Sequence, residues 1–322
     1  MPKTDVLMTA PMLPLVVQRA EEMFRLHRLW EVPDRDAFLR EIGPQIRGVA
    51  TSTGHGMTNA ALLDRLPNLE IVASFGVGYD NVDVAYAAKR GLIVTNTPDV
   101  LNDEVADFTL GLLLATVRQL PQAERYLRAG HWPKAPFPLG PTLRGRKVGI
   151  VGLGRIGKAI AQRVAAFDVE VLYHGRTRQE GVPYPYYPTL IGLAEASDVL
   201  VVITPGGPST KNLVDAEVLR ALGPEGILIN VARGSIVDEP ELVAALVEGR
   251  LGGAGLDVFA DEPRVPQALI DMDHIVLMPH IASASVHTRT AMGQLVLDNL
   301  ATFFAGKGPL TPVPETPWAG AN

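Results

Sequence analysis

The feature that most restricts the fold of this chain is a glycine-rich turn placed between an apolar strand and a helix. The run Lys147–Val151 is followed at once by GLGRIG, and then by a helical stretch from Lys158 to Phe167. The first glycine permits a tight turn, the second lets the backbone approach a pyrophosphate, and the third lets the helix pack on the strand. Free N–H groups at the start of the helix then face the anion. The pattern predicts a dinucleotide held by Gly152, Leu153, Gly154, Arg155, Ile156 and Gly157.

Short β-like runs alternate with helical stretches along the whole chain, which is typical of parallel sheets covered by helices. We therefore expect an α/β protein with two doubly wound domains, one a Rossmann dinucleotide-binding domain and the other a discontinuous flavodoxin-like substrate domain. The first series of strands is predicted at residues 5–8, 46–51, 71–74 and 92–95, with helices at 14–24, 35–42 and 60–66. The second series is predicted at residues 147–151, 170–173, 198–203, 226–230, 254–257 and 275–278.

Two long helical stretches mark the domain boundaries. One opens at Asn102, a good N-cap residue, and the other runs from about Ser285 to Phe304. A chain that returns to its first domain by a final helix makes that domain discontinuous. We thus predict a substrate-binding domain of residues 1–101 plus 286–322 and a dinucleotide-binding domain of residues 102–285. Residues 120–146 are expected to form an irregular arm or lid, and the proline-rich tail after Gly308 to be loosely held.

The end of the second strand of the dinucleotide-binding domain indicates which cofactor is bound. NAD-binding folds carry an Asp or Glu there for the ribose hydroxyls, whereas an arginine suits a 2′-phosphate. Here the strand is followed by Gly175, Arg176, Thr177 and Arg178, with no acid. We therefore expect NADP(H) to be preferred and NAD(H) to remain possible. The alternative is that both arginines are solvated loop charges.

Among the seven histidines, His280 follows the predicted strand at 275–278, at the sheet edge where doubly wound folds bind ligands. Arg233 and Glu262 follow neighbouring strands in the same way. An arginine can hold a carboxylate in a fork and polarise the adjacent carbonyl. A histidine kept protonated by a carboxylate can give a proton to that carbonyl as a hydride arrives. These three residues are predicted to be catalytic in 2-oxo acid reduction, and the alternative is three unrelated loop residues.

Composition excludes several other classes of protein. The formal net charge of −6 provides no basic stripe, so we expect no nucleic-acid partner. The absence of cysteine and of paired metal-ligating histidines argues against a metal site. No apolar run reaches the length of a signal sequence or a membrane span, so a soluble, cytoplasmic protein without a membrane partner is expected.

Several motifs together resemble those of the D-isomer-specific 2-hydroxyacid dehydrogenases over nearly the whole chain. They are the glycine loop, the runs NVARGSIVDE from Asn230 and GAGLDVFADEP from Gly253, and Pro279-His280. The resemblance implies Arg233 as substrate binder, Glu262 as the partner of the histidine and His280 as acid/base. It also implies substrate binding by the backbone at Val77 and Gly78, together with Arg233 and His280. Cofactor contacts are implied for Thr204, Pro205, Ala232 and Asp257, and less firmly for Thr109.

Within the family, the stretches TNTPDV from Thr95 and LVAALVEGR from Leu242 are similar to NADPH-preferring glyoxylate/hydroxypyruvate and hydroxyphenylpyruvate reductases. The ribose-binding Asp of NAD-preferring members falls on Gly175, whereas Thr204–Pro208 departs from the common pattern.

The resemblance implies a homodimer in which Trp132 borders the partner's pocket, the alternative being a packing tryptophan. Two other functions stay open: a dinucleotide-sensing, corepressor-like binding protein and a short phosphoglycerate dehydrogenase. Formate oxidation is disfavoured, because its relatives carry an amide where Glu262 stands.

Overall fold

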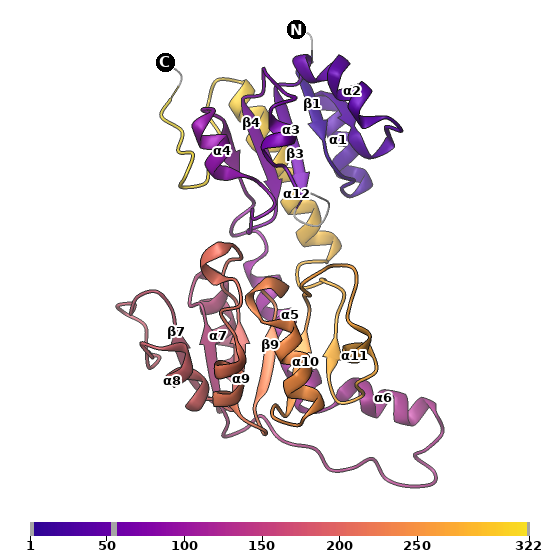
Figure 1. Cartoon of the computed structure of the whole chain (residues 1–322), viewed down its shortest axis with the longest axis vertical. Coiled ribbons are helices and arrows are strands. Elements are labelled where there is room, and N and C mark those ends of the chain that lie inside the picture. The colour runs from indigo at the N-terminus through magenta and orange to yellow at the C-terminus, as the bar shows by residue number, and fades with distance from the viewer. Residues whose placement is uncertain (1–2, 53–56, 321–322) are drawn as a thin grey trace. The chain divides into compact units, whose positions relative to one another are not determined.

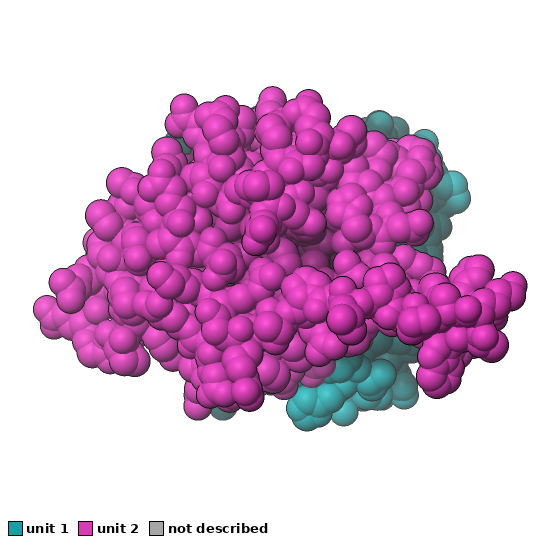
Figure 2. Space-filling model, turned by 90° about the horizontal axis from the view of Figure 1, so that it is seen from below, with its two compact units in different colours: residues 1–101, 285–322 teal, residues 102–284 magenta. Residues whose placement is uncertain are grey.

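A computed structural model describes residues 3–52 and 57–320 of the chain. The chain divides into two compact units, which Figure 2 colours separately. Unit 1 comprises residues 1–101 and 285–322, and unit 2 comprises residues 102–284. Over the described ranges, no helix combines the length and the apolar character needed to cross a membrane.

Unit 1 is built on a five-stranded parallel sheet in the order β2-β1-β3-β4-β5. Figure 1 labels β1, β3 and β4 of this sheet. This is the flavodoxin-like order, with the topological switch between β1 and β3. Helices α1 and α12 pack together, with α12 against β3 and β4, whereas α2, α3 and α4 contribute to an apolar cluster with the strands. The strands are β1 (Asp5–Met8), β2 (Arg25–Arg28), β3 (Gly48–Ser52), β4 (Ile71–Phe75) and β5 (Ile93–Thr95). The helices are α1 (Pro14–Met23), η1 (Leu29–Glu31), α2 (Arg35–Ile42), η2 (Gly43–Gln45), α3 (Ala60–Leu63), α4 (Val84–Lys89) and α12 (Val286–Phe304).

Strand β2 is absent from the sequence-based expectation. Its residues, RLHR, include no β-branched side chain and no Phe, Tyr or Trp, and three of the four are basic, so no strand pattern is present. Its position at the sheet edge explains this composition, because charged side chains on an edge strand discourage pairing with other chains. His27 of this strand pairs with Asp5 of β1 at 2.7 Å.

The C-terminal tail is held more firmly than its composition suggests. The Val313 N–H donates to the Val94 carbonyl at 2.9 Å, and the Val94 N–H donates to Thr316 Oγ1 at 2.9 Å. Further along, the Trp318 ring packs on Phe303 with centroids 5.4 Å apart. The expectation of a loosely held tail was therefore wrong, because the tail satisfies the otherwise unpaired edge of β5.

Unit 2 contains a six-stranded parallel sheet in the order β11-β10-β9-β8-β6-β7. A parallel bridge between Tyr173 and Tyr186 adds a vestigial strand beyond β7, in the place of the third strand of a Rossmann sheet. The strands are β6 (Lys147–Val151), β7 (Glu170–His174), β8 (Val199–Val202), β9 (Ile227–Asn230), β10 (Gly253–Leu256) and β11 (Val276–Leu277). The helices are α5 (Asn102–Val117), α6 (Leu120–Arg128), α7 (Arg155–Ala165), α8 (Leu190–Glu195), η3 (Pro208–Thr210), α9 (Ala216–Leu222), η4 (Gly234–Ile236), α10 (Glu239–Val247) and α11 (Gln267–Ile270).

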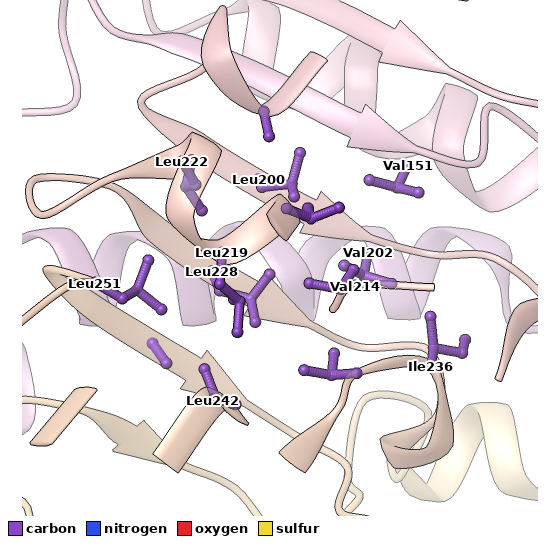
Figure 3. Close-up of a cluster of buried hydrophobic side chains, with 14 of the residues drawn as sticks. Val151, Leu200, Val202, Val214, Leu219, Leu222, Leu228, Ile236, Leu242 and Leu251 are labelled. Atoms are coloured by element: carbon purple, nitrogen blue, oxygen red, sulfur yellow. The ribbon is translucent and has the colours of Figure 1, made fainter. Parts of the chain in front are cut away.

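The sheet of unit 2 is buried on both faces. Strand β8 shows this directly, since Leu200 and Val202 point into one apolar cluster while Val199 and Val201 point into the other. Figure 3 shows the first cluster, in which leucines of α9 and α10 meet side chains of the central strands. Each such side chain contributes about 1.5–3 kcal/mol when fully buried. This packing fixes the strand ends from which the site is built.

The start of the predicted irregular arm is helical. Residues Leu120–Arg128 form α6, which corrects the expectation for this part of residues 120–146 (Figure 1). Pro121 is compatible with the helix because it lies in the first turn, where its missing N–H costs nothing. Arg125 and Arg128 lie in the last turn, where positive charge is favourable.

Candidate active site

The glycine loop lies between β6 and α7 with the geometry its sequence predicts. Strand β6 ends at Val151, and α7 begins at Arg155. A Cβ atom on Gly157 would lie 2.1 Å from the carbonyl oxygen of Gly152, so only glycine fits this close approach of helix and strand. The N-cap of α7 is Gly154, which offers no side-chain acceptor to the first turn. The N–H groups of that turn are thus suited to a phosphate.

Thr204 lies beside this loop at the topological switch point between β6 and β8. A Cβ atom on Gly152 would come within 2.9 Å of Thr204 Cγ2. Thr204 Oγ1 is buried and has no hydrogen-bond partner among the described residues. A buried hydroxyl without a partner is costly unless a ligand satisfies it. The glycine loop and Thr204 together fit a dinucleotide, and Pro205 follows Thr204 in the chain.

The loop after β7 is tied to the glycine loop by two hydrogen bonds. The Gly152 N–H donates to the His174 carbonyl at 2.9 Å, and Gln179 Nε2 donates to the Leu153 carbonyl at 2.6 Å. The loop residues Gly175–Arg178 lie between these two attachments. Arg176 and Arg178 are exposed, and neither forms an ion pair within the described part of the chain. Two arginines next to a phosphate-binding turn are suited to a further phosphate.

Arg233 follows β9 in a turn that is held by Asn230, the buried last residue of that strand. Asn230 Oδ1 accepts from the Ala232 N–H at 3.1 Å, and Nδ2 donates to the Arg233 carbonyl at 3.1 Å. The Arg233 guanidinium donates to the Ala232 carbonyl at 2.7 Å. A Cβ on Gly234 would lie 1.9 Å from the carbonyl carbon of Phe259, so glycine is required for this turn to pack on the segment leading to Glu262.

Glu262 and His280 form a hydrogen-bonded pair at the ends of β10 and β11. His280 Nδ1 lies 2.7 Å from Glu262 Oε2, and Glu262 Oε1 accepts from the Phe259 N–H at 3.0 Å. The two side chains are 34% and 31% exposed. Because a carboxylate on Nδ1 fixes the proton there, the Nε2 atom is left for a reacting group. The structure thus brings the predicted acid/base pair together.

Electrostatics favour the ionised form of Glu262. Burial by itself raises the pKa of the Glu262 carboxyl, but the hydrogen bond and charge of His280, the Phe259 N–H and the charge of Arg233 outweigh burial. The pKa of Glu262 therefore lies below its ordinary value. The carboxylate is therefore ionised where it meets Nδ1 of the imidazole. Arg233 is close enough to take part in the same electrostatic cluster.

Asp257 anchors the segment that carries His280. Its side chain is fully buried, and its oxygens accept from the Ile281 and Ala282 N–H groups at 2.8 and 2.9 Å. The His280 N–H donates to the Asp257 carbonyl at 2.8 Å. His280 itself has a φ of 55°, a left-handed conformation that non-glycine residues rarely adopt. Burial raises the pKa of Asp257, and the two N–H groups and the His280 charge offset this only in part. Asp257 thus holds His280 in a strained backbone position.

The remaining predicted residues are placed as follows. Ala232 is buried in the turn before Arg233, and the Thr109 hydroxyl donates to the Val105 carbonyl within α5 at 2.6 Å. Val77 and Gly78 belong to unit 1, in the loop after β4. The ligand contacts of these residues stay predictions.

Of the other histidines, His131 packs on Tyr126, His174 Nδ1 bonds to the Tyr187 carbonyl, and His55 lies outside the described residues.

Because of the Glu262–His280 pair, we expect the stability of the fold to fall in acid in a way that depends on Glu262. Because the pKa of Glu262 is lower in the folded state, the ionised carboxylate stabilises the fold above the ordinary value of 4.5. As pH falls through that value, the unfolded chain takes up the proton first, so stability is lost until the folded pKa is passed. The wild type should thus lose more stability than Glu262→Gln between about pH 5 and pH 3. The midpoint of thermal unfolding, measured at several pH values, tests this. Glu217→Gln, at an exposed glutamate, is the control. Parallel curves for wild type and Glu262→Gln would contradict the assignment.

Comparison with known proteins places the chain in a family. Residues 110–282 match the NAD binding domain of the D-isomer specific 2-hydroxyacid dehydrogenases. The chain belongs to this family, as the sequence motifs predict, and is an NAD(P)-dependent oxidoreductase with two parallel-sheet α/β domains, one of them a Rossmann domain.

Three relatives are similar to this chain over almost its full length. It is 48% identical to hydroxyphenylpyruvate reductase of Plectranthus scutellarioides, covering 96% of this chain and 98% of that protein. It is 47% identical to glyoxylate/hydroxypyruvate reductase A of Arabidopsis thaliana, covering 97% of this chain and 100% of the relative. A crystal structure of an NADPH-dependent glyoxylate/hydroxypyruvate reductase from Sinorhizobium meliloti, in complex with NADP and malonate, aligns with a TM-score of 0.93 at 53% identity over 98% of each chain. These relatives favour the reductase over the dinucleotide sensor.

Proposed function

We propose that this protein reduces a small 2-oxo acid, such as glyoxylate or hydroxypyruvate, to the D-2-hydroxy acid with NADPH as the preferred reductant. The observation that carries the proposal is the 2.7 Å Glu262–His280 pair, with the Arg233 charge acting on the same carboxylate. The pair lies in the unit that also carries the glycine loop. The named activities of the relatives support this choice of substrate class.

The substrate carboxylate and carbonyl are matched by Arg233. Its planar guanidinium can donate two parallel hydrogen bonds to a carboxylate or bridge to the adjacent carbonyl oxygen. The turn that carries Arg233 is fixed by the two polar side-chain atoms of Asn230, Oδ1 and Nδ2. A positive charge held at this point stabilises the negative charge that develops on the carbonyl oxygen during reduction.

His280 supplies the proton. With Nδ1 held by Glu262, an imidazolium carries its second proton on Nε2 and can donate it to the carbonyl oxygen. The lowered pKa of Glu262 keeps its carboxylate charged, so this carboxylate can fix the orientation of the ring through Nδ1. When bound, NADPH supplies a hydride to the carbonyl carbon. In the reverse direction, neutral His280 accepts the proton of the hydroxyl group.

The cofactor preference follows from the loop after β7. The N–H groups at the start of α7 and the Thr204 hydroxyl suit the pyrophosphate side of a dinucleotide, and Arg176 and Arg178 suit a 2′-phosphate. Gly175 leaves no carboxylate to repel that phosphate. NADH lacks the phosphate but shares every other feature, so it remains usable.

Arg176→Ala tests this assignment. Removing a charge-assisted hydrogen bond to the phosphate should weaken NADPH binding about ten- to hundredfold and leave NADH nearly unchanged. Dissociation constants from cofactor fluorescence measure both. Arg220→Ala, an exposed arginine in the last turn of α9, is the matched control. If Arg176→Ala left the ratio of the two affinities unchanged, the phosphate would be bound elsewhere.

The substrate class is tested by following NADPH absorbance with purified wild-type protein. Glyoxylate and hydroxypyruvate should be reduced, and hydroxyphenylpyruvate reports whether the pocket accepts an aromatic side chain. The same panel with NADH gives the cofactor preference. Absence of turnover with every 2-oxo acid would refute the proposed function and leave cofactor binding without catalysis.

Two further assignments belong to this proposal. Unit 1 is the substrate-binding domain, and the Val77 and Gly78 N–H groups donate hydrogen bonds to the substrate carboxylate.

The protein forms a homodimer through the segment around α6, whose Leu120, Leu127 and Trp132 are 53%, 57% and 66% exposed. Such a row of exposed apolar side chains is typical of an interface. Sedimentation analysis of the wild type, with Trp132→Ala alongside, tests the second assignment.

A further inference from the structure

The loop after β4 in unit 1 is attached to the segment after the neighbouring strand β5. The Thr97 N–H donates to the Gly76 carbonyl at 2.8 Å, and Asn96 Nδ2 donates to the Val77 carbonyl at 2.9 Å. In return, the Gly76 N–H donates to Thr97 Oγ1 at 3.0 Å. Two consecutive carbonyl groups of the loop are therefore held by two consecutive residues of the adjacent segment.

These attachments determine where the next N–H groups point. In a trans peptide, the C=O of one residue and the N–H of the following residue lie in one plane and point in opposite directions. Holding the Gly76 carbonyl directs the Val77 N–H away from Thr97. Holding the Val77 carbonyl likewise directs the Gly78 N–H away from Asn96. Both N–H groups therefore face away from the segment after β5.

Neither of these N–H groups has a hydrogen-bond partner within the ranges that the structure describes. Val77 and Gly78 are only half-buried, so a ligand can reach them. Successive backbone N–H groups that point to one side form a concavity that binds anions. A carboxylate, with two oxygens, matches two such donors.

Asn96 is itself held from the C-terminal tail. Thr311 Oγ1 donates to the Asn96 carbonyl at 2.7 Å, and the Asn96 N–H donates to the Thr311 carbonyl at 3.3 Å. Asn299, fully buried in α12, donates from Nδ2 to Thr311 Oγ1 at 2.9 Å and accepts the Thr311 N–H at 3.0 Å. A continuous chain of hydrogen bonds thus runs from the core of unit 1 to the Val77 carbonyl.

We propose that Asn96 is a positioning residue for 2-oxo acid reduction: its amide orients the Val77–Gly78 peptide so that two N–H groups meet the substrate carboxylate. The inference rests on the proposed function and extends it to a residue that does not touch the substrate. It also gives the C-terminal tail a role, since Thr311 and Asn299 fix the position of Asn96. The side chain contributes a donor, and its effect passes entirely through the backbone of the loop.

Asn96→Ala is the direct test. Without the amide, the Val77–Gly78 peptide can rotate, so KM for glyoxylate should rise about five- to fiftyfold while kcat changes much less. The inhibition constant of oxalate, a dicarboxylate that cannot be reduced, should rise by a similar factor. NADPH affinity should stay within twofold of the wild type. Asn68→Ala, which removes an amide bonded to the Pro44 carbonyl elsewhere in unit 1, is the matched control and should change none of these values.

Two comparisons separate positioning from a loss of structure. Thr311→Val keeps the shape of the side chain but removes the hydroxyl, so it should also raise KM for glyoxylate, by a smaller factor than Asn96→Ala. Should Asn96→Ala fail to fold, Thr311→Val takes its place as the test. An unchanged KM and oxalate constant in folded Asn96→Ala, or a parallel loss of NADPH affinity, would overturn the inference. If the wild type reduced no 2-oxo acid at all, the proposed function would fail instead, so the two failures are distinguishable.

Discussion

Replacing His280 by alanine should lower kcat for 2-oxo acid reduction by about 10²- to 10⁴-fold, the usual contribution of a positioned general acid. The imidazole is the proton donor that the structure pairs with Glu262, and its loss leaves the developing negative charge on oxygen unprotonated. NADPH binding should be nearly unaffected, because the glycine loop lies between β6 and α7, whereas His280 follows β11. Steady-state kinetics with hydroxypyruvate and a cofactor titration measure both effects.

The control for this experiment is His274→Ala, which lies before β11 in the same unit, whereas His280 follows that strand. It should retain wild-type kcat. If His280→Ala kept more than a tenth of wild-type kcat, the proton would come from another group. If it lost NADPH affinity together with kcat, His280 would hold the cofactor site rather than the proton.

Arg233→Ala should lower kcat/KM by about 10²- to 10³-fold, the usual cost of removing one donor that stabilises the oxyanion of a transition state. Two interactions are lost together: the fork to the substrate carboxylate and the charge that stabilises the carbonyl oxygen in the transition state. Glu262 also loses a neighbouring positive charge. Initial rates over a range of glyoxylate concentrations give the value.

Arg233→Lys is the matched variant, because it keeps the charge but not the planar fork. It should recover part of the lost kcat/KM and remain well below the wild type. Full activity in the lysine variant would show that charge alone is needed. An alanine variant with unchanged kcat/KM would show that Arg233 does not bind the substrate.

Much of the site could be predicted because it lies where strands end. The strand-loop-helix pattern around Gly152 and Gly157 is local, and local geometry is encoded in adjacent residues. Arg233, Glu262 and His280 each follow an apolar run, and parallel strands bring their carboxyl ends to one edge. The pairing of Glu262 with His280 then needs only the order β9-β10-β11.

Other features could not be predicted because they depend on contacts between distant segments. Strand β2 has no strand-like composition and exists because β1 offers it an edge. The tail is ordered by β5 and by Asn299, more than ten residues away along the chain from Thr311. The roles of Asn230 and Asn96 could not be predicted from the sequence, since an asparagine at the end of a strand or just after it is also common in ordinary turns. In each case the decisive partner is fixed only by the completed fold.

The role of Arg233, Glu262 and His280 in 2-oxo acid reduction can be measured in one experiment. The wild-type protein is incubated with hydroxypyruvate and NADPH, and the product is resolved by chiral chromatography. We expect one D-hydroxy acid to form for each NADPH consumed, with His280→Ala forming almost none in the same time. NADPH left unconsumed, or an L-hydroxy acid as the product, would show that these residues do not act as proposed.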